Sequence, residues 1–239
     1  MVEIQNLSKR FGRFEVLREI NANFKSGKIT AIAGPNGSGK TTLIKIILGL
    51  VKADNGIVYV FGEPINGDCS YRQKIGYMPQ IANYPENLTI SDIIKLIKEL
   101  RNVRGNIEEK FIREFNLEND LNKPIRTLSG GTRQKVGAVL SLMFDPSVLI
   151  FDEPTVGMDP VVSSRFKEIM LEEKQKGKVI IITSHVMSEI EELADEILFL
   201  LNGKVYFSGL ISELLISQNE TKLERAVAKI LENQTILDV

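Results

Sequence analysis

Residues 28–50 of the chain, KITAIAGPNGSGKTTLIKIILGL, determine the expected fold. A short β-rich run is followed at once by a glycine-rich loop and then by an apolar helical segment, which predicts a strand, a loop and a helix. Within this stretch, Gly34–Thr41 matches the pattern G-x-x-x-x-G-K-[ST] at every fixed position. A loop of this kind between a strand and a helix predicts a binding site for nucleotide phosphates.

The residue types in this loop explain how it would hold phosphate. Glycines let consecutive backbone N–H groups point inward, and the N-terminus of the following helix adds a partial positive charge. Lys40 supplies a full charge for the terminal phosphates, and the Thr41 hydroxyl is placed to bind Mg²⁺. The alternative, a glycine-rich turn without a ligand, does not need lysine and threonine in this order. The residues expected to contact nucleotide are Gly34, Pro35, Asn36, Gly37, Ser38, Gly39, Lys40, Thr41 and Thr42.

A second motif, VLIFDEP at residues 148–154, is an apolar run that ends in two acids. Burying adjacent carboxylates without a partner costs several kcal/mol, so a cation is expected at this strand end. Mg²⁺ is the candidate. Asp152 would hold it through the second coordination shell of the ion, and Glu153 would face the water that attacks the γ-phosphate. The alternative is that both acids are merely solvated at the end of a strand.

Outside these motifs, strand patterns occupy both ends of the chain and helical patterns the middle. The apolar period is helical over residues 89–144, where Thr89 and Asp92 have the spacing of a capping box, and strand patterns return afterwards. Asn202 and Gly203 predict the turn of a hairpin, and the tail beyond it is amphipathic. We expect a nucleotide-binding core with an antiparallel β subdomain at residues 1–85 and 146–208, an inserted helical subdomain at 86–145, and a C-terminal helical tail at 209–239.

The composition limits the classes of protein that fit. The 239 residues are 43% hydrophobic, which is enough for a substantial core, and 30 basic against 31 acidic residues give a formal net charge of −1. That balance argues against a protein held mainly by nucleic-acid phosphates or by an anionic membrane surface. The chain has one cysteine, Cys69, and one histidine, His185, so neither an internal disulfide nor a zinc site built on these residues is expected. Since no stretch of about 18 uncharged apolar residues occurs, we expect that the chain itself does not cross a membrane.

A third motif, LSGGT at Leu128–Thr132, completes the set. Physically it is a helix N-terminus with a serine cap and two glycines that let backbone N–H groups approach an anion. In this order, after the glycine-rich loop and before the DEP run, it resembles the signature of the nucleotide-binding subunits of ABC transporters, the ATP-binding cassette proteins. The resemblance covers about residues 2–209. It implies an α/β fold with a P-loop NTPase, RecA-like core, a mixed sheet, an N-terminal antiparallel β subdomain and an inserted α-helical subdomain.

The resemblance also assigns roles to single residues. Gln80 is similar to the family's glutamine that contacts Mg²⁺ and the attacking water and relays their state to a membrane partner. His185 resembles the histidine that contacts the γ-phosphate. Phe11 aligns with the aromatic residue that stacks on adenine; Phe14 is the alternative, and a core role is the other interpretation of either residue. The resemblance thus implies catalytic roles for Glu153, His185 and Gln80, metal binding by Thr41, Gln80 and Asp152, and further nucleotide contacts by Ser129, Gly130, Gly131 and Asp159.

The sequence departs from the family pattern in two places. The signature ends in Thr132 where glutamine is usual, and the D-loop, the segment after the DEP run, has VGMD at Val156–Asp159 where Ser-Ala-Leu-Asp is commoner. Both changes leave the backbone donors and Asp159 in place, so we expect altered contacts between subunits rather than lost hydrolysis. The runs LSGGTRQKV and DEPTVGMDP look especially similar to the ATPase subunit of exporters such as the Nos copper-processing system.

The resemblance implies ATP and Mg²⁺ as cofactors and two partners, a transmembrane permease subunit and a second ATP-binding subunit. One chain carries every half-site element once, so a complete site needs two cassettes, with two copies of this chain favoured over this chain and a relative. We expect ATP hydrolysis that drives transport, with export favoured over import, in a cytoplasmic protein peripheral on the inner face of the cell membrane. No nucleic-acid partner is expected. The alternative is a soluble ATPase of the same family that acts on nucleic acid or the ribosome.

Overall fold

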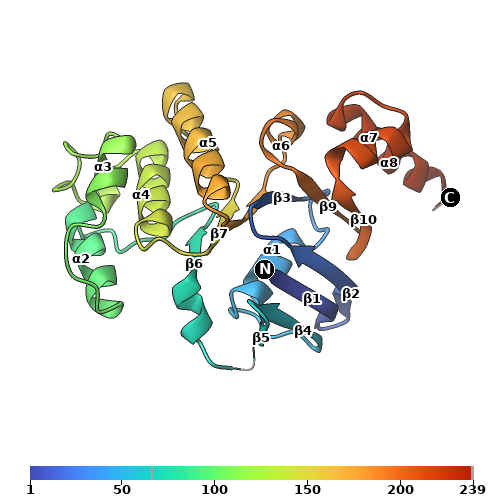
Figure 1. Cartoon of the computed structure of the whole chain (residues 1–239), viewed down its shortest axis with the longest axis horizontal. Coiled ribbons are helices and arrows are strands. Elements are labelled where there is room, and N and C mark those ends of the chain that lie inside the picture. The colour runs from blue at the N-terminus through green and yellow to red at the C-terminus, as the bar shows by residue number, and fades with distance from the viewer. Residues whose placement is uncertain (66, 238–239) are drawn as a thin grey trace.

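The computed structural model describes residues 1–65 and 67–237, with the side chains of residues 234–237 left out. Asn66, within the predicted core, and Asp238 and Val239, at the end of the predicted tail, lie outside the described residues. The described strands form two sheets, and helices flank the larger of them (Figure 1). This arrangement is the mixed α/β fold that the sequence predicts.

The larger sheet has six strands in the order β10-β9-β3-β8-β7-β6. The strands from β9 to β6 run parallel, and β10 pairs antiparallel with β9 at one edge. β7 and β8 are buried along their whole length, as expected of continuous apolar runs covered on both faces. The strands of this sheet are β3 (Lys28–Ala33), β6 (Ile75–Met78), β7 (Val148–Asp152), β8 (Val179–Thr183), β9 (Glu196–Leu201) and β10 (Lys204–Leu210).

The smaller sheet is antiparallel and has the order β2-β1-β4-β5. Its buried side chains, such as Leu7 and Ile20, form one apolar cluster with Leu43 of α1 and with Ile150 of β7. The N-terminal antiparallel β subdomain therefore covers one face of the larger sheet, with α1 between them. The strands of the smaller sheet are β1 (Val2–Phe11), β2 (Phe14–Phe24), β4 (Asn55–Val60) and β5 (Glu63–Pro64).

The helices follow the start and stop signals of the sequence. Thr89 and Asp92 form the capping box of α2 that their spacing predicts, and Asp159 caps α5, whose first residue is a proline. None of the helices among the described residues is long and apolar enough to span a membrane. The helices are α1 (Lys40–Ile47), α2 (Ile90–Leu100), α3 (Glu109–Glu114), α4 (Gly130–Leu142), α5 (Pro160–Gln175), α6 (Met187–Leu193), α7 (Ile211–Gln218) and α8 (Leu223–Leu237), with short 3₁₀ turns at Ser70–Lys74 and Ile125–Thr127.

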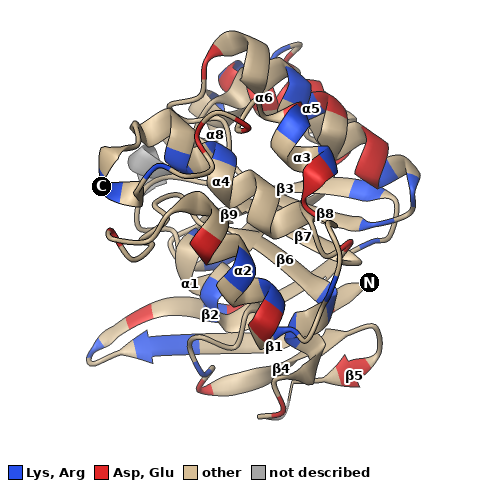
Figure 2. Cartoon of the chain, turned by 90° about the vertical axis from the view of Figure 1, so that its left-hand side faces the viewer, with Lys and Arg blue, Asp and Glu red and all other residues tan. Residues whose placement is uncertain are grey.

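Three helices, α2, α3 and α4, come between β6 and β7 in the chain and lie together at one end of the molecule (Figure 1). An ion pair joins this group to α5: Arg165 Nε and Nη2 lie 2.6 and 2.9 Å from the two carboxylate oxygens of Glu114 on α3. Acidic and basic residues are mixed along α3 and α5 in this region (Figure 2). The group of three helices also shares one apolar cluster with β7 and α5, so it packs directly on the core, while the exact subdomain limits stay a prediction.

The C-terminal region combines a confirmed turn with one helix, α6, that the sequence did not indicate. Asn202 and Gly203 have φ values of 50° and 75°, as the predicted hairpin turn between β9 and β10 requires. α6 has only seven residues, so it shows no long apolar period, whereas α7 follows β10 without a loop and lies within residues 209–239, where a helical tail is expected. At the other edge of the sheet, β6 ends at Met78, two residues before Gln80.

Candidate nucleotide-binding site

The carboxyl ends of β3, β7 and β8 and the segment after β6 meet at one edge of the larger sheet. A pocket of about 510 Å³ lies at this edge, which is where ligands bind in open parallel sheets. Its volume is in the range of small-molecule sites. The residues that line it are Val16, Asn36, Gly37, Gly39, Lys40, Thr41, Thr42, Gln80, Asp152, Glu153 and His185. The glycine-rich loop and the DEP run are thus brought together with Gln80 and His185.

The glycine-rich loop ends at Gly39, which is the N-cap of α1. Its φ is 105°, and a Cβ at this position would lie 2.5 Å from Leu17 Cδ2 and 2.9 Å from the carbonyl oxygen of Val16. Both the left-handed backbone and the lack of space require glycine. Because glycine has no side chain, no side-chain oxygen caps α1, and the first N–H groups of the helix are left to an anion.

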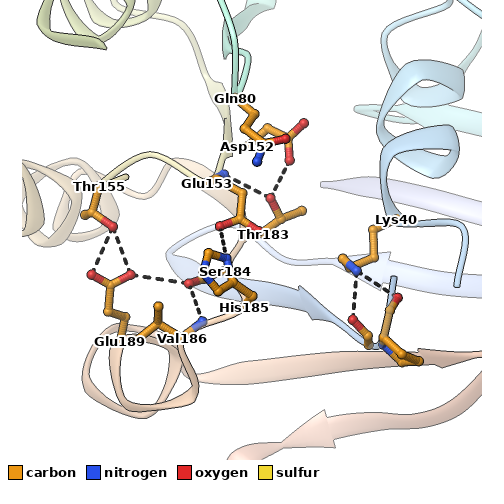
Figure 3. A network of polar contacts seen from close by, with 12 residues as sticks. Lys40, Gln80, Asp152, Glu153, Thr155, Thr183, Ser184, His185, Val186 and Glu189 are labelled. Atoms are coloured by element: carbon orange, nitrogen blue, oxygen red, sulfur yellow. Dashed lines mark hydrogen bonds and ion pairs between the residues drawn. The ribbon is translucent and has the colours of Figure 1, made fainter. Parts of the chain in front are cut away.

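Lys40 places an ammonium group beside this helix end. Its Nζ donates to the carbonyl oxygens of Gly34 and Pro35, at 2.7 and 3.0 Å, within its own loop (Figure 3). Burial lowers the pKa of Lys40, whereas the carboxylates of Glu153 and Asp152 act to raise it. A cation held by neutral carbonyl groups next to free helix N–H groups fits the phosphate groups of a nucleotide.

The two acids after β7 are buried and are held by β8. Asp152 Oδ1 accepts a hydrogen bond of 2.5 Å from Thr183 Oγ1, and the Glu153 N–H donates to the same hydroxyl at 3.0 Å. Glu153 has a φ of 54°, a left-handed conformation that costs about 1–3 kcal/mol for a residue with a side chain and that clusters at functional sites. Thr183 therefore fixes the Asp152 carboxylate and the backbone of Glu153 at the pocket.

Glu153 and His185 form the closest polar pair in the pocket. His185 Nδ1 lies 2.5 Å from Glu153 Oε2, and the two side chains point toward one another from the ends of adjacent strands (Figure 3). The Glu153 side chain is only 11% exposed, whereas that of His185 is 67% exposed. A buried carboxylate beside an imidazole is an arrangement that can orient a water molecule and take a proton from it.

The pocket also holds oxygen donors that suit a hard cation. Thr41, Gln80 and Asp152 all line it, and hydroxyl, amide and carboxylate oxygens are the ligand types that Mg²⁺ takes. Among the residues that the structure describes, no group of three or more His, Cys, Asp or Glu could hold a metal ion. The residues therefore fit a Mg²⁺ that completes its coordination with nucleotide phosphates and water, as is usual for this ion.

Some residues of the loop lie around the pocket rather than in its lining. Gly34 and Pro35 supply the carbonyl groups that bind Lys40, and the Ser38 N–H donates to the carbonyl oxygen of Pro35 at 3.2 Å. Ser38 is buried, and its Oγ has no hydrogen-bond partner among the described residues. These three residues shape the loop that presents Lys40 and α1.

The residues of the LSGGT motif lie outside the pocket. Ser129 caps α4, its Oγ accepting from the Thr132 N–H at 3.1 Å, and both Ser129 and Gly130 are exposed. Gly131 packs against the D-loop, and Asp159 caps α5 and lies 3.6 Å from Lys135 of α4. The structure therefore places the signature on the surface of the chain and not over its own glycine-rich loop.

The predicted base-stacking residue is also outside the pocket lining. Phe11 is 49% exposed at the end of β1, where it pairs with Phe14, which is 80% exposed. Val16, two residues further along β2, does line the pocket, and sequence reasoning did not find it. Nothing in the strand pattern of residues 16–24 distinguishes Val16, because its position in the pocket depends on how β2 lies against the loop.

Thr183 is the second residue that sequence reasoning missed. Its hydroxyl contacts both Asp152 and the backbone of Glu153, but none of the motifs found in the sequence includes it. A polar residue at the end of the run VIIIT is a visible signal, since a buried hydroxyl needs a hydrogen-bond partner.

The fold and the site together define the class of protein. A glycine-rich loop that presents a lysine at a helix N-terminus, opposite buried acids at the end of a neighbouring strand, is the arrangement of a P-loop nucleotide-hydrolysing protein. Residues 17–156 match the family described as ABC transporter. The chain belongs to this family.

Individual relatives agree with this assignment. The chain is 36% identical over 207 residues to the lantibiotic transport ATP-binding protein SrtF of Streptococcus pyogenes, with 86% of this chain and 89% of that protein covered. It is 32% identical over 220 residues to the Nod factor export ATP-binding protein I of Ralstonia nicotianae, with 90% and 68% covered.

Solved structures agree as well. The structure of an ATP-binding subunit of an ABC transporter is similar with a TM-score of 0.91 and 28% identity, over 97% of this chain and 99% of that one. A dimeric ATP-binding cassette in a post-hydrolysis state, bound to ADP and Pi, is similar with a TM-score of 0.79 and 25% identity, over 88% and 99%. The chain is an ATP-binding subunit of an ABC transporter, and it is an ATPase.

Proposed function

We propose that two copies of this chain close on two ATP molecules and thereby drive a separate membrane permease. The observation that carries this proposal is the position of the signature. Ser129 and Gly130 are exposed at the N-terminus of α4, outside the pocket that contains Lys40 and Glu153. A helix N-terminus binds anions, so the signature of one copy is suited to cover the phosphates held by the other. The related cassette bound to ADP and Pi is dimeric, which supports the same arrangement.

Each pocket residue then has a defined role in hydrolysis. Lys40 and the N–H groups of the loop bind the phosphates, and Glu153 orients the attacking water and accepts its proton. His185 holds Glu153 in place and reaches toward the γ-phosphate. Thr41, Gln80 and Asp152 hold Mg²⁺, which neutralises charge on the phosphate oxygens when it is bound. Phe11, with Phe14 as the alternative, stacks on adenine.

The proposed permease contact lies next to the glutamine segment. A groove of about 370 Å³ begins beside Gln80 and has apolar walls that include Pro79, Tyr84, Leu140 and Phe144. Gln80 itself accepts a hydrogen bond of 2.7 Å on its carbonyl oxygen from Gln134 of α4. A partner in this groove would therefore sense both the pocket and the signature helix. We propose that the chain lies on the cytoplasmic face of the membrane, because the relatives to which it is similar are ATP-binding proteins of transporters.

The direction of transport follows from the relatives. Their printed descriptions name lantibiotic transport and Nod factor export, and we propose that this chain likewise serves an exporter. A soluble ATPase that acts on nucleic acid or the ribosome is not favoured by these relatives.

Size-exclusion chromatography of Glu153→Gln tests the dimer. Removal of the proton acceptor should leave nucleotide binding intact and stop turnover, so ATP should produce a dimer that is absent without nucleotide. Gly130→Glu in the same background is the matched control. A Cβ at Gly130 meets nothing within 4 Å in the chain itself, so the monomer should still bind ATP while the added carboxylate repels the phosphates of the other copy. A monomer in Glu153→Gln, or a dimer that survives Gly130→Glu, would refute the proposed interface.

A further inference from the structure

A carboxylate outside the pocket joins the two segments that carry Glu153 and His185. Glu189 lies on α6, and both of its carboxylate oxygens are 2.9 Å from Thr155 Oγ1. One of them, Oε2, is also 3.3 Å from Ser184 Oγ (Figure 3). Thr155 is two residues after Glu153, and Ser184 is the residue before His185. A single side chain thus contacts both segments next to the Glu153–His185 pair.

The contacts extend around the histidine. The Val186 N–H donates to Ser184 Oγ at 3.0 Å, so a hydrogen bond joins the two residues that flank His185. The Glu189 side chain is 20% exposed and does not belong to the pocket lining. Its hydrogen bonds therefore join two side-chain hydroxyls next to the site, outside the pocket lining.

We propose that Glu189 is a positioning residue for hydrolysis. It fixes the segment after Glu153 and the segment around His185 in one geometry, and this keeps His185 Nδ1 within 2.5 Å of Glu153 Oε2. The strained φ of Glu153 makes such support necessary, because residues in this conformation persist only when their surroundings hold them. The inference rests on the roles proposed above for Glu153 and His185.

The chain offers a matched control on the same helix. Lys167 of α5 lies 3.9 Å from Glu189 Oε1 and 2.7 Å from Glu192 Oε2. Glu192 therefore shares the cation with Glu189, but its side chain is 58% exposed and its hydrogen bond goes to Lys167 rather than to Thr155 or Ser184. Loss of Glu192 removes a charge from α6 and leaves the two segments joined.

The first measurement compares ATPase kinetics of Glu189→Ala, Glu189→Gln and Glu192→Ala. Because small misplacements of reacting groups cost up to about 100-fold in rate, Glu189→Ala should lower kcat by about 10- to 100-fold. The KM for ATP should change by no more than about twofold, since the lysine and the helix end are untouched. The kcat of Glu189→Gln should lie between those of Glu189→Ala and the unaltered chain, because its amide oxygen still accepts from one hydroxyl. Glu192→Ala should keep its kcat within about twofold of the unaltered chain.

The second measurement uses nitrogen NMR of the His185 ring in protein without a histidine tag. His185 is the only histidine of the chain, so its ring signals need no assignment. Glu189→Ala should move the Nδ1 signal toward its position in Glu153→Gln, in which the carboxylate partner is gone. Glu192→Ala should leave the signal in place.

These outcomes separate the inference from the proposed function. If Glu189→Ala has the kcat of Glu192→Ala, or lowers kcat without moving the His185 signal, Glu189 is not a positioning residue. If Glu153→Gln keeps full turnover, the proposed role of Glu153 fails instead. Should Glu189→Ala not fold, Thr155→Val and Ser184→Ala each remove one of the two links, and unaltered kcat and ring signals in both would overturn the inference.

Discussion

Two helix N-termini of this chain are rich in glycine and can each bind an anion through backbone N–H groups, but they are capped differently. At α1 the N-cap is Gly39, no side chain occupies the first N–H groups, and the helix opens into the pocket with Lys40 and Glu153. At α4 the N-cap is Ser129, which accepts from the Thr132 N–H and also lies 2.9 Å from the Thr132 hydroxyl. The first helix end leaves its donors to a ligand, whereas the second satisfies one of them itself.

This difference in capping fits the positions of the two helix ends, since the N-terminus of α1 lies at the pocket and that of α4 is exposed on the surface. Uncapped N–H groups are unfavourable without a partner, and a bound phosphate supplies that partner at α1. The capped end of α4 is stable in the absence of a ligand, so it can lie on the surface until another molecule brings an anion to it. One chain therefore contains a nucleotide-binding site and, apart from it, an exposed helix end that we propose completes the site of a second copy.

Replacing the lysine at each helix should give the largest contrast. Lys40→Ala removes charge-assisted contacts to phosphate, each about 1.5–3 kcal/mol, so the Kd for ATP should rise by about 10- to 100-fold. Lys135→Ala, on α4, removes only the 3.6 Å contact with Asp159 and should change the Kd of the monomer by less than about twofold. Isothermal titration of dilute protein with ATP measures both. Similar losses in the two variants would show that the helix ends are not functionally distinct.

The adjacent glycines of α4 sharpen the comparison through stability. A Cβ at Gly131 would lie 2.4 Å from the carbonyl oxygen of Gly157 in the D-loop, whereas one at Gly130 would meet no atom within 4 Å. Gly131→Ala should lower the free energy of unfolding by about 1–3 kcal/mol, because the helix must move away from the D-loop. Gly130→Ala should raise it by as much as about 1 kcal/mol, because alanine is the better helix former. Urea unfolding without nucleotide gives both values, and a shift of the same sign in both would contradict the packing described.

Features that depend on local sequence were predictable. The cap of α2 at Thr89 and the hairpin turn at Asn202 and Gly203 need only a few neighbouring residues, and both are confirmed. The mixed sheet and the antiparallel β subdomain followed from the family resemblance and are also confirmed. The division into three units stays a prediction.

Features that depend on which segments meet were not predictable. Sequence motifs and the family resemblance pointed to Lys40, Gln80, Glu153 and His185 as site residues, and the structure brings all four into one pocket. Their roles stay predictions. The sequence does not indicate the left-handed backbone conformation of Glu153, because the surrounding structure imposes it. Val16, Thr183 and Glu189 contact the site from other elements, and no spacing rule relates them to it.

The cap of α4 itself provides the smallest effect. If the Ser129 hydroxyl makes this helix end independent of a ligand, Ser129→Ala should lower the free energy of unfolding by about 1 kcal/mol without nucleotide. Ser129→Gly is the control, since glycine at an N-cap costs only a few tenths of a kcal/mol. Neither change should alter the Kd for ATP of the monomer, because Ser129 lies outside the pocket. Equal stability of the alanine variant and the unaltered chain would mean that the capping bond does not stabilise α4, and that its exposed end needs a ligand as much as α1 does.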